Sequence, residues 1–460
     1  MFNSESLDQI IKAYDIRGLV DAQLTPEFAF AVGGAFARFL EDEREPATIV
    51  MGEDMRPSSP ILGQAFADGV CAQGMDVIRI GLASTDMLYF ASGRLNLPGV
   101  MFTASHNPAA YNGMKLCKSG ARPIGLESGL ARIKSYLIEG FPIANRVIGK
   151  ISERSMLDEY VSFLLGVFDS EESPQERRLK VVIDAGNGMA GYTAPAVMAK
   201  LNVEVIPMYF ELDGTFPNHE ANPIEPANLV DLQRRVLEEK ADIGLAFDGD
   251  ADRCFLIDEK GALVNPSSLT SLIAVRELAR KPESSIIYNV ISSKAVAEVV
   301  REHGGTAVRS RVGHSFIKKL MADTGAIFGG EHSGHFYFAD FWRADSGMLA
   351  ALYALTELAE SDKTLSDLIA PYNRYVSSGE INTKVLDIPA AIERILAQFS
   401  TGNEVDQLDG ITISNSSWWF NVRPSNTEPL LRLNVEAESR DEMSKVRGEV
   451  LAVICALPLN

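Results

Sequence analysis

Short apolar runs rich in β-branched residues alternate with amphipathic stretches from the start of the chain to about residue 350. Such runs predict strands, and the amphipathic stretches predict helices. The predicted strands fall into three sets: 47–51, 76–80 and 99–103; 180–184, 203–209 and 243–247; and 285–290, 306–310 and 326–328. This alternation is typical of parallel sheets with crossover helices, so we expect three successive α/β units.

The same spacing predicts helix positions and junctions. Thr25-Pro26-Glu27 combines an N-cap, a first-turn proline and an early acid, which predicts a helix running towards Leu40. Further helices are expected from near Ser155 and over 228–240. The tail from Ile381 predicts a smaller α+β unit that ends in a helix near 440–454. We place junctions in the charged stretch 169–178, which could instead be a surface loop of the second unit, and in the polar segment 371–378.

Length and composition narrow the class of protein. A chain of 460 residues exceeds a single core, and 46% hydrophobic with 23% charged residues is ordinary for a soluble globular protein. The 43 basic and 62 acidic residues give a formal net charge of −19. That charge disfavours nucleic acid or an anionic membrane as the main partner. An anionic substrate would need a local basic pocket.

The N-terminal residues, the lack of a long apolar run and the cysteines indicate a cytoplasmic location. Residues 1–5 lack the basic region and apolar core of a signal peptide, and no apolar run is long enough to span a bilayer. The four cysteines show no metal-ligand spacing and are expected to be small buried residues in a reducing compartment: Cys71, Cys117, Cys254 and Cys455. We therefore expect a cytoplasmic protein.

The segment 103–108, Thr-Ala-Ser-His-Asn-Pro, places Ser105 and His106 directly after a predicted strand. The ends of strands are where α/β proteins present reactive groups. Ser, Asn and Pro are also common turn residues, so the segment alone fits a polar turn as well as a reactive loop.

The segment 248–253, Asp-Gly-Asp-Ala-Asp-Arg, places three carboxylates at alternate positions after an apolar run. Hard cations such as Mg²⁺ prefer oxygen ligands. An EF-hand is excluded because Arg253 stands where that loop needs glycine, and because the flanks, including 254–258, predict strands. A solvated acidic turn is the alternative. Three acids between apolar strands would repel one another without a cation, so we favour a metal site.

The segment 186–191 matches the Gly-x-Gly-x-x-Gly fingerprint of dinucleotide-binding proteins, and Glu211 lies 20 residues further on. Asp184 at the strand end would oppose a pyrophosphate, and the segment is interior to the chain. We favour a glycine-dependent turn between strand and helix, with an NAD-dependent dehydrogenase as the alternative.

Two further polar clusters suit sugar phosphates. The segment 329–335 puts Glu331, Ser333 and two histidines on a glycine-rich loop that suits sugar hydroxyls. A histidine metal site is disfavoured because the i, i+4 spacing is missing. The segment 423–429 offers an arginine, hydroxyls and an amide to a phosphate, or is an ordinary loop. Four of the six histidines lie in these clusters or beside Gly313, whereas two are expected on solvated turns or helix ends: His219 and His303.

Four segments, in this order, resemble the motifs of the α-D-phosphohexomutase superfamily, and its phosphomannomutase/phosphoglucomutase branch best of all: TASHNP, DGDADR, GEHSGH and RPSNTEP. The resemblance implies an α/β fold of three similar α/β domains with mixed sheets and a smaller C-terminal α+β domain around a central cleft. The expected domains are 1–150 with the phosphoserine loop, 151–256 with the metal loop, 257–370 with the sugar-recognition loop and 371–460 with the phosphate-binding loop.

The resemblance also implies roles for single residues. Ser105 would carry the transferable phosphoryl group and, with Asp248, Asp250 and Asp252, would hold one Mg²⁺ per chain. The other catalytic residues would be His106, Lys115, Arg253 and His314. The substrate-binding residues would be Tyr14, Arg17, Glu331, Ser333, His335, Arg423, Ser425, Asn426 and Thr427.

The implied reaction interconverts mannose 6-phosphate and mannose 1-phosphate, and glucose phosphates as well, through phospho-Ser105 and a hexose 1,6-bisphosphate that also activates the enzyme. A phosphoglucomutase, a phosphoglucosamine mutase and a non-catalytic sugar-phosphate binding protein are the alternatives. A lysine that some relatives place soon after the strand near 287–291 is missing, and Lys294 is the nearest. His332 stands where phosphoglucosamine mutases typically carry Gln, which disfavours that substrate.

Overall fold

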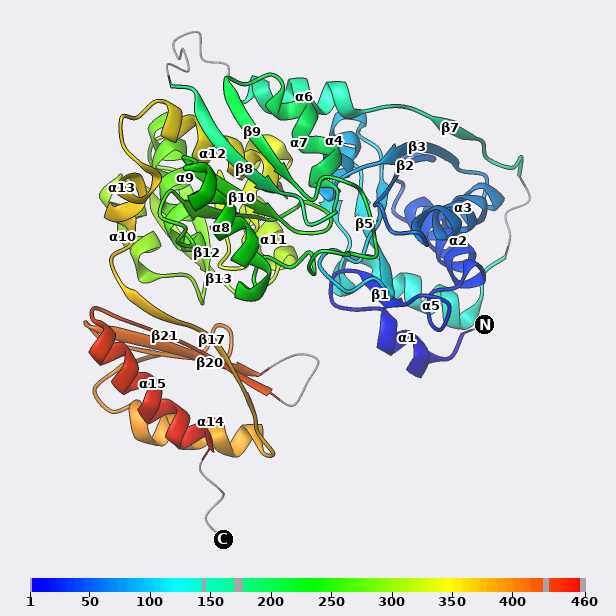
Figure 1. The fold of residues 1–460 in the computed structure, drawn as a ribbon. Coiled ribbons are helices and arrows are strands. Elements are labelled where there is room, and N and C mark those ends of the chain that lie inside the picture. Colours follow the sequence, from blue (N-terminus) through cyan, green and yellow to red (C-terminus); the bar gives the residue numbers. More distant parts are fainter. Residues whose placement is uncertain (1, 143–145, 169–176, 425–429, 456–460) are drawn as a thin grey trace. The chain divides into compact units, whose positions relative to one another are not determined.

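The computed structural model describes residues 2–142, 146–168, 177–424 and 430–455 (Figure 1). The chain divides into two compact units, Met1–Val264 with Ser333–Leu368 and Asn265–His332 with Ile369–Asn460. Within the described ranges, no helix is both long and apolar enough to cross a membrane.

The first sheet of the first unit has the strand order β1-β5-β4-β2-β3-β7, with β6 beside β5. Its strands are β1 (Ile16–Leu19), β2 (Thr48–Glu53), β3 (Asp76–Leu82), β4 (Gly99–Phe102), β5 (Tyr111–Lys118), β6 (Arg122–Pro123) and β7 (Ile151–Glu153). β2 runs parallel to β3 and β4, whereas β5 is antiparallel to β4 and β1. The sheet is mixed, and not purely parallel as the alternation alone suggested, because β5 returns from β4 without a crossover helix.

Five α-helices surround this sheet: α1 (Ser4–Ile10), α2 (Pro26–Asp42), α3 (Ser59–Ala72), α4 (Thr85–Leu95) and α5 (Ala131–Glu139), the last preceded by the helical turn η1 (Leu126–Leu130). As predicted, Thr25 caps α2 by accepting a hydrogen bond from the backbone N–H of Phe28, and Pro26 opens the helix. α2, α3 and α5 share one hydrophobic core with β2 and β4. That core fixes the ends of β4 and β5, which carry candidate site residues.

The second sheet has the order β11-β10-β8-β9. β8 (Leu179–Asp184), β9 (Val203–Met208) and β10 (Ile243–Phe247) are parallel, and β11 (Cys254–Asp258) is antiparallel to β10. Its helices are α6 (Leu157–Gly166), α7 (Ala190–Met198) and α8 (Val230–Glu239), with the turn η2 (Pro226–Leu229) before α8. The first unit also contains β15 (Phe336–Phe338), η3 (Ala339–Phe341), β16 (Ala344–Asp345), the buried α12 (Gly347–Ala359) and most of α13 (Leu365–Ile369).

The second unit begins with the parallel strands β12 (Ser285–Asn289), β13 (Thr306–Ser310) and β14 (Phe328–Gly330). Their helices are α9 (Pro266–Arg280), α10 (Lys294–Glu302) and α11 (His314–Thr324). β14 begins and ends two residues later than predicted, and its end was missed because Gly329 and Gly330 carry no side chain that signals a strand.

The C-terminal part follows the turn η4 (Ala370–Tyr372) and is an antiparallel sheet of order β17-β21-β20-β19-β18. Its strands are β17 (Val376–Lys384), β18 (Glu404–Asp406), β19 (Ile411–Ser414), β20 (Trp418–Pro424) and β21 (Leu430–Ala437). α14 (Ile388–Phe399) and α15 (Arg440–Cys455) cover one face of this sheet (Figure 1) and share its core. The predicted α+β tail is thus present, starting at Val376 instead of Ile381.

The cysteine prediction is wrong for one residue. Cys71, Cys117 and Cys254 are buried, as expected, but Cys455 is exposed at the end of α15. The helix turns its Val450, Val453 and Ile454 side chains into the core, which leaves Cys455 on the outer face.

Candidate active site

The Ser105 loop (residues 103–108) follows β4 and is fixed by a buried arginine. Ser105 has φ 50°, an uncommon conformation for a residue other than glycine. The guanidinium of Arg56, which is fully buried, donates hydrogen bonds to the carbonyl oxygens of Ser105 at 3.0 Å and Asn107 at 2.6 Å. It also donates to those of Pro108 at 3.0 Å and Tyr111 at 2.9 Å. These four bonds hold the strained loop in one conformation.

The acidic loop (residues 248–253) joins β10 to β11 and lies against the Ser105 loop. Ser105 Oγ donates to Asp248 Oδ2 at 2.9 Å. A Cβ atom on Gly249 would lie 2.4 Å from the carbonyl oxygen of Ser105, so this close approach requires glycine. The two loops therefore meet through a serine hydroxyl, a carboxylate and a glycine.

Two side chains, one from the first sheet and one from helix α4, hold the acidic loop. Lys115 on β5 donates to Asp250 Oδ2 at 2.7 Å and to Asp252 Oδ2 at 2.6 Å. Thr85, the first residue of α4, donates its hydroxyl to Asp250 Oδ2 and its backbone N–H to the carbonyl oxygen of Asp250. Burial lowers the pKa of Lys115, but Asp250 and Asp252 raise it further, so that it stays well above its ordinary value. Lys115 therefore places a positive charge on β5 against the aspartates of the acidic loop.

The three carboxylates of the acidic loop are buried, and one oxygen from each lies within 4.8 Å of the others. Burial, then Asp252 and Asp250, raises the pKa of Asp248 well above its ordinary value. Burial would also raise the pKa of Asp252, but Lys115, His335 and Arg253 hold it well below. Two buried oxygens, Asp250 Oδ1 and Asp252 Oδ1, accept no hydrogen bond from the residues that the structure describes. This crowded set of hard oxygen donors fits a divalent cation.

His106 and Arg253 adjoin Ser105. Arg253 Nη2 lies 2.9 Å from His106 Nδ1, and Ser105 Oγ lies 3.2 Å from the same nitrogen. Burial, then the charges of Arg253 and Arg17, lowers the pKa of His106 well below its ordinary value. Because a guanidinium can only donate, Nδ1 accepts and the neutral imidazole carries its proton on Nε2. His106 is therefore an uncharged ring beside the serine at neutral pH.

His335 is placed near the same arginine. Its Nε2 accepts from Arg253 Nε at 3.2 Å and lies 3.5 Å from Asp252 Oδ1, while its Nδ1 lies 2.9 Å from Ser333 Oγ. Ser333 and His335 of the predicted sugar-binding loop thus join the acidic loop.

The N-terminal residues Tyr14 and Arg17 lie at the start of β1. Arg17 Nη1 donates to Asn107 Oδ1 at 2.6 Å, and its other nitrogens pair with Asp15. The structure thus places Arg17 at the Ser105 loop, as expected. Tyr14 is partly buried just before β1.

The second unit carries the remaining candidates. Buried Glu331, directly after β14, accepts on Oε1 from the backbone N–H of Gly313 at 3.1 Å and from Asn289 Nδ2 at 3.3 Å. Arg423, near the end of β20, donates from Nη2 to Glu380 Oε2 at 2.9 Å. Ser425, Asn426 and Thr427 lie outside the described residues, and so does the side chain of His314, the first residue of α11.

Lys294, the lysine nearest to the strand at 287–291, contacts the C-terminal part of the chain. Its Nζ donates to the carbonyl oxygen of Ser416 at 3.0 Å and lies 4.1 Å from the centre of the Tyr375 ring. Ser416 and Tyr375 both belong to the C-terminal part of the chain. These two contacts engage the ammonium group of Lys294.

The glycines at 186–191 support the acidic loop. They form the turn between β8 and α7, where Met189 donates its N–H to the carbonyl oxygen of Gly249 at 2.9 Å. A Cβ atom on Gly188 would lie 2.6 Å from that oxygen. The carboxylate of Asp184 accepts a hydrogen bond from the N–H of Gly186 and so stabilises the turn. This is the same charge that would repel a pyrophosphate. The predicted glycine-dependent turn is confirmed.

The prediction for His219 is wrong, whereas that for His303 is confirmed. His219 Nε2 lies 3.0 Å from Asp184 Oδ2, so the ring is paired and partly buried instead of solvated. Burial lowers the pKa of His219, but Asp184 raises it above its ordinary value. His303 is exposed at the end of α10.

The sequence did not point to several residues that hold this site. Arg56 and Thr85 are two of them, and a third is Asp86, which accepts hydrogen bonds from Ser84, Tyr160 and Ser346. Apart from the bond between Ser84 and Asp86, these contacts join segments far apart in the chain. The available signals, a helix N-cap at Ser84 and an acid-x-arginine pair at 54–56, also fit purely local roles.

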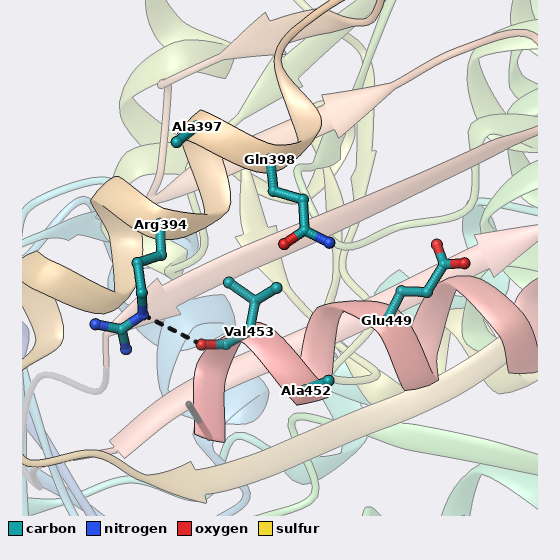
Figure 2. A pocket seen from close by; sticks show the side chains of 6 residues that line it. All are labelled: Arg394, Ala397, Gln398, Glu449, Ala452 and Val453. Atoms are coloured by element: carbon teal, nitrogen blue, oxygen red, sulfur yellow. Dashed lines mark hydrogen bonds between the residues drawn. The ribbon is translucent and has the colours of Figure 1, made fainter. Parts of the chain in front are cut away.

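A groove of about 630 Å³ lies elsewhere, between α14 and α15 (Figure 2). Arg394 and Glu449 are its charged residues, and Arg394 Nε donates to the carbonyl oxygen of Val453 at 3.4 Å. It contains neither a cluster of titratable groups nor a residue of the predicted motifs, so it offers no catalytic chemistry.

Comparison with known proteins agrees with this geometry. Family models described as phosphoglucomutase/phosphomannomutase alpha/beta/alpha domains I, II and III match residues 8–140, 158–261 and 265–375. The model of the C-terminal domain of the same proteins matches residues 380–453.

Relatives match nearly the whole chain. The phosphomannomutase of Salmonella typhimurium is 39% identical over 453 residues, covering 96% of this chain and 98% of the relative. The phosphomannomutase/phosphoglucomutase of Pseudomonas putida is 36% identical over 449 residues, covering 96% and 94%. A crystal structure of a phosphoglucomutase/phosphomannomutase family protein from Burkholderia thailandensis superimposes with a TM-score of 0.89 at 31% identity, covering 99% and 98%. These matches overturn the dehydrogenase alternative, and the chain belongs to the phosphoglucomutase/phosphomannomutase family of phosphohexomutases.

Proposed function

We propose that this isomerase interconverts mannose 6-phosphate and mannose 1-phosphate, accepts glucose phosphates as well, and carries the transferred phosphate on Ser105. The observation that carries the proposal is the 2.9 Å contact between Ser105 Oγ and Asp248 in a buried three-carboxylate loop. Two buried cations, Lys115 and Arg253, flank this contact. The names of the relatives support mannose as the preferred sugar.

Each transfer exchanges one oxygen–phosphorus bond for another. The bond from phosphorus to Ser105 Oγ breaks while a bond forms to the free hydroxyl oxygen of a hexose monophosphate. The hydroxyl proton passes to a base, and the serine oxygen ends protonated. The resulting hexose 1,6-bisphosphate turns around, and its other phosphate returns to Ser105. Such a reaction needs positioning and charge neutralisation more than covalent chemistry.

The acidic loop fits Mg²⁺, because hard oxygen donors converge there and two of them lack hydrogen bonds within the described part of the chain. Asp248, Asp250 and Asp252, together with Ser105 Oγ, would hold one ion per chain. When bound, the ion would neutralise negative charge on the phosphoryl group.

The charges of the site favour particular roles. Despite burial, the charges of Asp250 and Asp252 raise the pKa of Lys115, which lies between them and would neutralise negative charge at the acidic loop. His106 is neutral and lies beside Ser105, but its Nδ1 accepts from Arg253 and its Nε2 carries the proton, so it can act as the base only once Nδ1 is released from Arg253. Arg253 donates to His106 Nδ1, next to the serine, and would steady the transferred group. The substrate meets these local cations despite the net charge of −19.

At the other end of the substrate, Glu331 and Ser333 would bind sugar hydroxyls. Arg423, Ser425, Asn426 and Thr427 would bind the phosphate that is not reacting. Both phosphates must fit both ends in turn, so these contacts would depend on phosphate more than on the sugar.

A coupled assay with Mg²⁺ and catalytic hexose 1,6-bisphosphate tests the proposal, using both mannose 1-phosphate and glucose 1-phosphate. Ser105→Ala should abolish turnover of both, whereas the control Ser135→Ala should match the wild type, because the half-buried Ser135 hydroxyl donates to the carbonyl oxygen of Ala131 within its own helix. The ratio of kcat/KM for the two sugars gives the preference. Turnover by Ser105→Ala at the wild-type level would refute the phosphoserine mechanism, and a ratio favouring glucose would refute the preference.

A further inference from the structure

A second cavity, of about 270 Å³, lies within the second unit. It is formed by the end of β12, by β13 and α10, and by the hairpin of β19 and β20. The first three elements fall in the segment matched by the domain III model, and the hairpin falls in the C-terminal domain. A ligand in this cavity would contact both domains.

The cavity is distinct from the predicted phosphate-binding loop. Trp419 lines it at the start of β20, and the loop follows Pro424 at the other end of that strand. Five residues of extended strand span about 17 Å. The cavity is therefore not part of the predicted phosphate-binding loop, and its ligand has to be inferred from its own lining.

Positive charge dominates the lining. Lys294, Arg301 and Arg309 face one carboxylate, Glu298. That carboxylate is already engaged, since it accepts from Arg374 Nη1 at 3.2 Å and from the Tyr375 hydroxyl at 2.7 Å. The excess of cations is unusual on a chain with a net charge of −19.

One of these cations has no internal role. Within the described residues, the guanidinium of Arg301 makes no hydrogen bond or ion pair, in contrast to Arg309, which pairs with Asp406 at 2.6 Å and donates to Thr412 Oγ1 at 3.0 Å. An arginine fork suits a phosphate, to which it can donate two bonds at once.

The other residues that line the cavity suit the organic part of a ligand. Tyr288 and Trp419 supply rings, and Ser292, Ser414 and Asn415 supply hydroxyl and amide groups. Trp419 Nε1 donates to Glu436 Oε1 at 2.7 Å, which fixes the indole ring. The volume is below that of typical drug-sized pockets, so the ligand must be small.

We propose that this cavity binds a small organic phosphate, with its phosphate on Arg301 and its body against Tyr288 and Trp419. The site is separate from the mutase reaction and does not rest on it. A ligand that binds only the folded state stabilises it, so occupancy should raise the melting temperature.

Calorimetric titration of the full-length protein tests the proposal, with inorganic phosphate and adenosine 5′-monophosphate as probes. Adenosine 5′-monophosphate should bind at millimolar concentration or below, more tightly than phosphate alone, and should quench tryptophan fluorescence. Arg301→Glu should weaken binding at least tenfold, Arg301→Gln somewhat less, and the control Lys445→Gln, an exposed residue of α15, should bind normally. Arg301 is exposed, so its variants should fold, and an unchanged circular dichroism spectrum verifies this.

A second variant separates the cavity from the proposed active site. Arg423→Ala should retain nucleotide binding, because Arg423 does not line the cavity. Binding that survives Arg301→Glu but is lost in Arg423→Ala would overturn the proposal, as would the absence of saturable binding to the wild type. Equal affinity for phosphate and nucleotide would overturn the role of the two rings.

Discussion

Two arginines at opposite ends of the proposed reaction are held in contrasting ways. Arg56 is fully buried, and its guanidinium donates hydrogen bonds to four carbonyl oxygens in and around the Ser105 loop. Within the described part of the chain, Arg423 makes one ion pair, to Glu380, which also pairs with Arg432 at 3.3 Å. Arg56 therefore shapes the protein, whereas we propose that Arg423 exchanges Glu380 for a ligand. The reacting end is built into the fold, and the binding end is not.

Replacement of Lys115 tests this contrast with the largest expected effect. Lys115→Ala leaves Asp250 and Asp252 buried without their cation, which should cost about 3–5 kcal/mol of unfolding free energy and abolish turnover. Denaturant unfolding in EDTA measures the loss, and Mg²⁺ should restore part of it.

Lys118→Ala is the matched control, because Lys118 ends the same strand and pairs with the exposed Glu43. It should cost no more than about 1 kcal/mol. Equal losses from the two substitutions would show that the acidic loop is not a built-in part of the fold.

Arg56→Lys should have the next largest effect. An ammonium cannot reach all four carbonyl oxygens, so buried acceptors lose their donors at about 1–3 kcal/mol each. We expect a loss of about 3 kcal/mol and a fall in kcat with little change in KM, because the Ser105 loop loses its conformation and substrate contacts remain.

Arg79→Lys is the comparison, since Arg79 pairs with Glu53 from a partly exposed strand position. It should leave kcat unchanged. A variant Arg56→Lys with normal kcat and raised KM would reverse the assignment of the two arginines.

Arg423→Ala should act on binding. Loss of a charge-assisted fork to phosphate should raise KM about tenfold, while the unfolding free energy changes by less than about 1 kcal/mol. Arg432→Ala removes the neighbouring partner of Glu380 and should leave KM near the wild-type value. Equal KM values for the two variants would remove Arg423 from the substrate site.

The smallest effect concerns Asp86, whose pKa is raised to about 6 by burial, although Ser346, Ser84 and Tyr160 donate to it. The folded state holds this proton more tightly than the unfolded chain, in which the pKa is about 4. Stability from Asp86 is therefore present below pH 4 and is lost as the pH rises to about 6.

Asp86→Asn removes this titration. The stability of the variant relative to the wild type should improve on the order of 1 kcal/mol between pH 4 and 7 in denaturant unfolding. The exposed control Asp158→Asn should show no such trend. A flat difference for Asp86→Asn would mean that its carboxyl group does not titrate in this range.

The sequence predicted the strands best where both faces are buried. β10 and the 254–258 strand β11 are buried along their whole length and have the predicted bounds, because apolar runs that end at acids or polar turns leave few alternatives. The half-buried β13 also has the predicted bounds. β5 was not predicted, since buried Asn112 and Lys115 interrupt its apolar pattern. Those residues are satisfied by Ser58, Ser59 and two aspartates from elsewhere in the chain.

The candidate site residues also divide into those that the sequence predicted and those that it did not. Ser105 and the three aspartates stand in compact motifs, so their spacing and the family resemblance were sufficient to select them. Arg56, Thr85 and Asp86 act across 49, 165 and 260 residues, and no local pattern records such partners. The glycines at 186–191 predicted a turn from sequence alone, but only the fold showed that Gly188 and Gly249 mark close backbone contacts.

The central claim is that Ser105 carries the phosphate. Intact mass spectrometry with peptide mapping, before and after incubation with hexose 1,6-bisphosphate and Mg²⁺, tests it most directly. We predict one phosphate per chain, located on Ser105, that is lost on incubation with excess hexose monophosphate as the bisphosphate appears. Fully active enzyme with unmodified Ser105, or with its phosphate on another residue, would contradict the account.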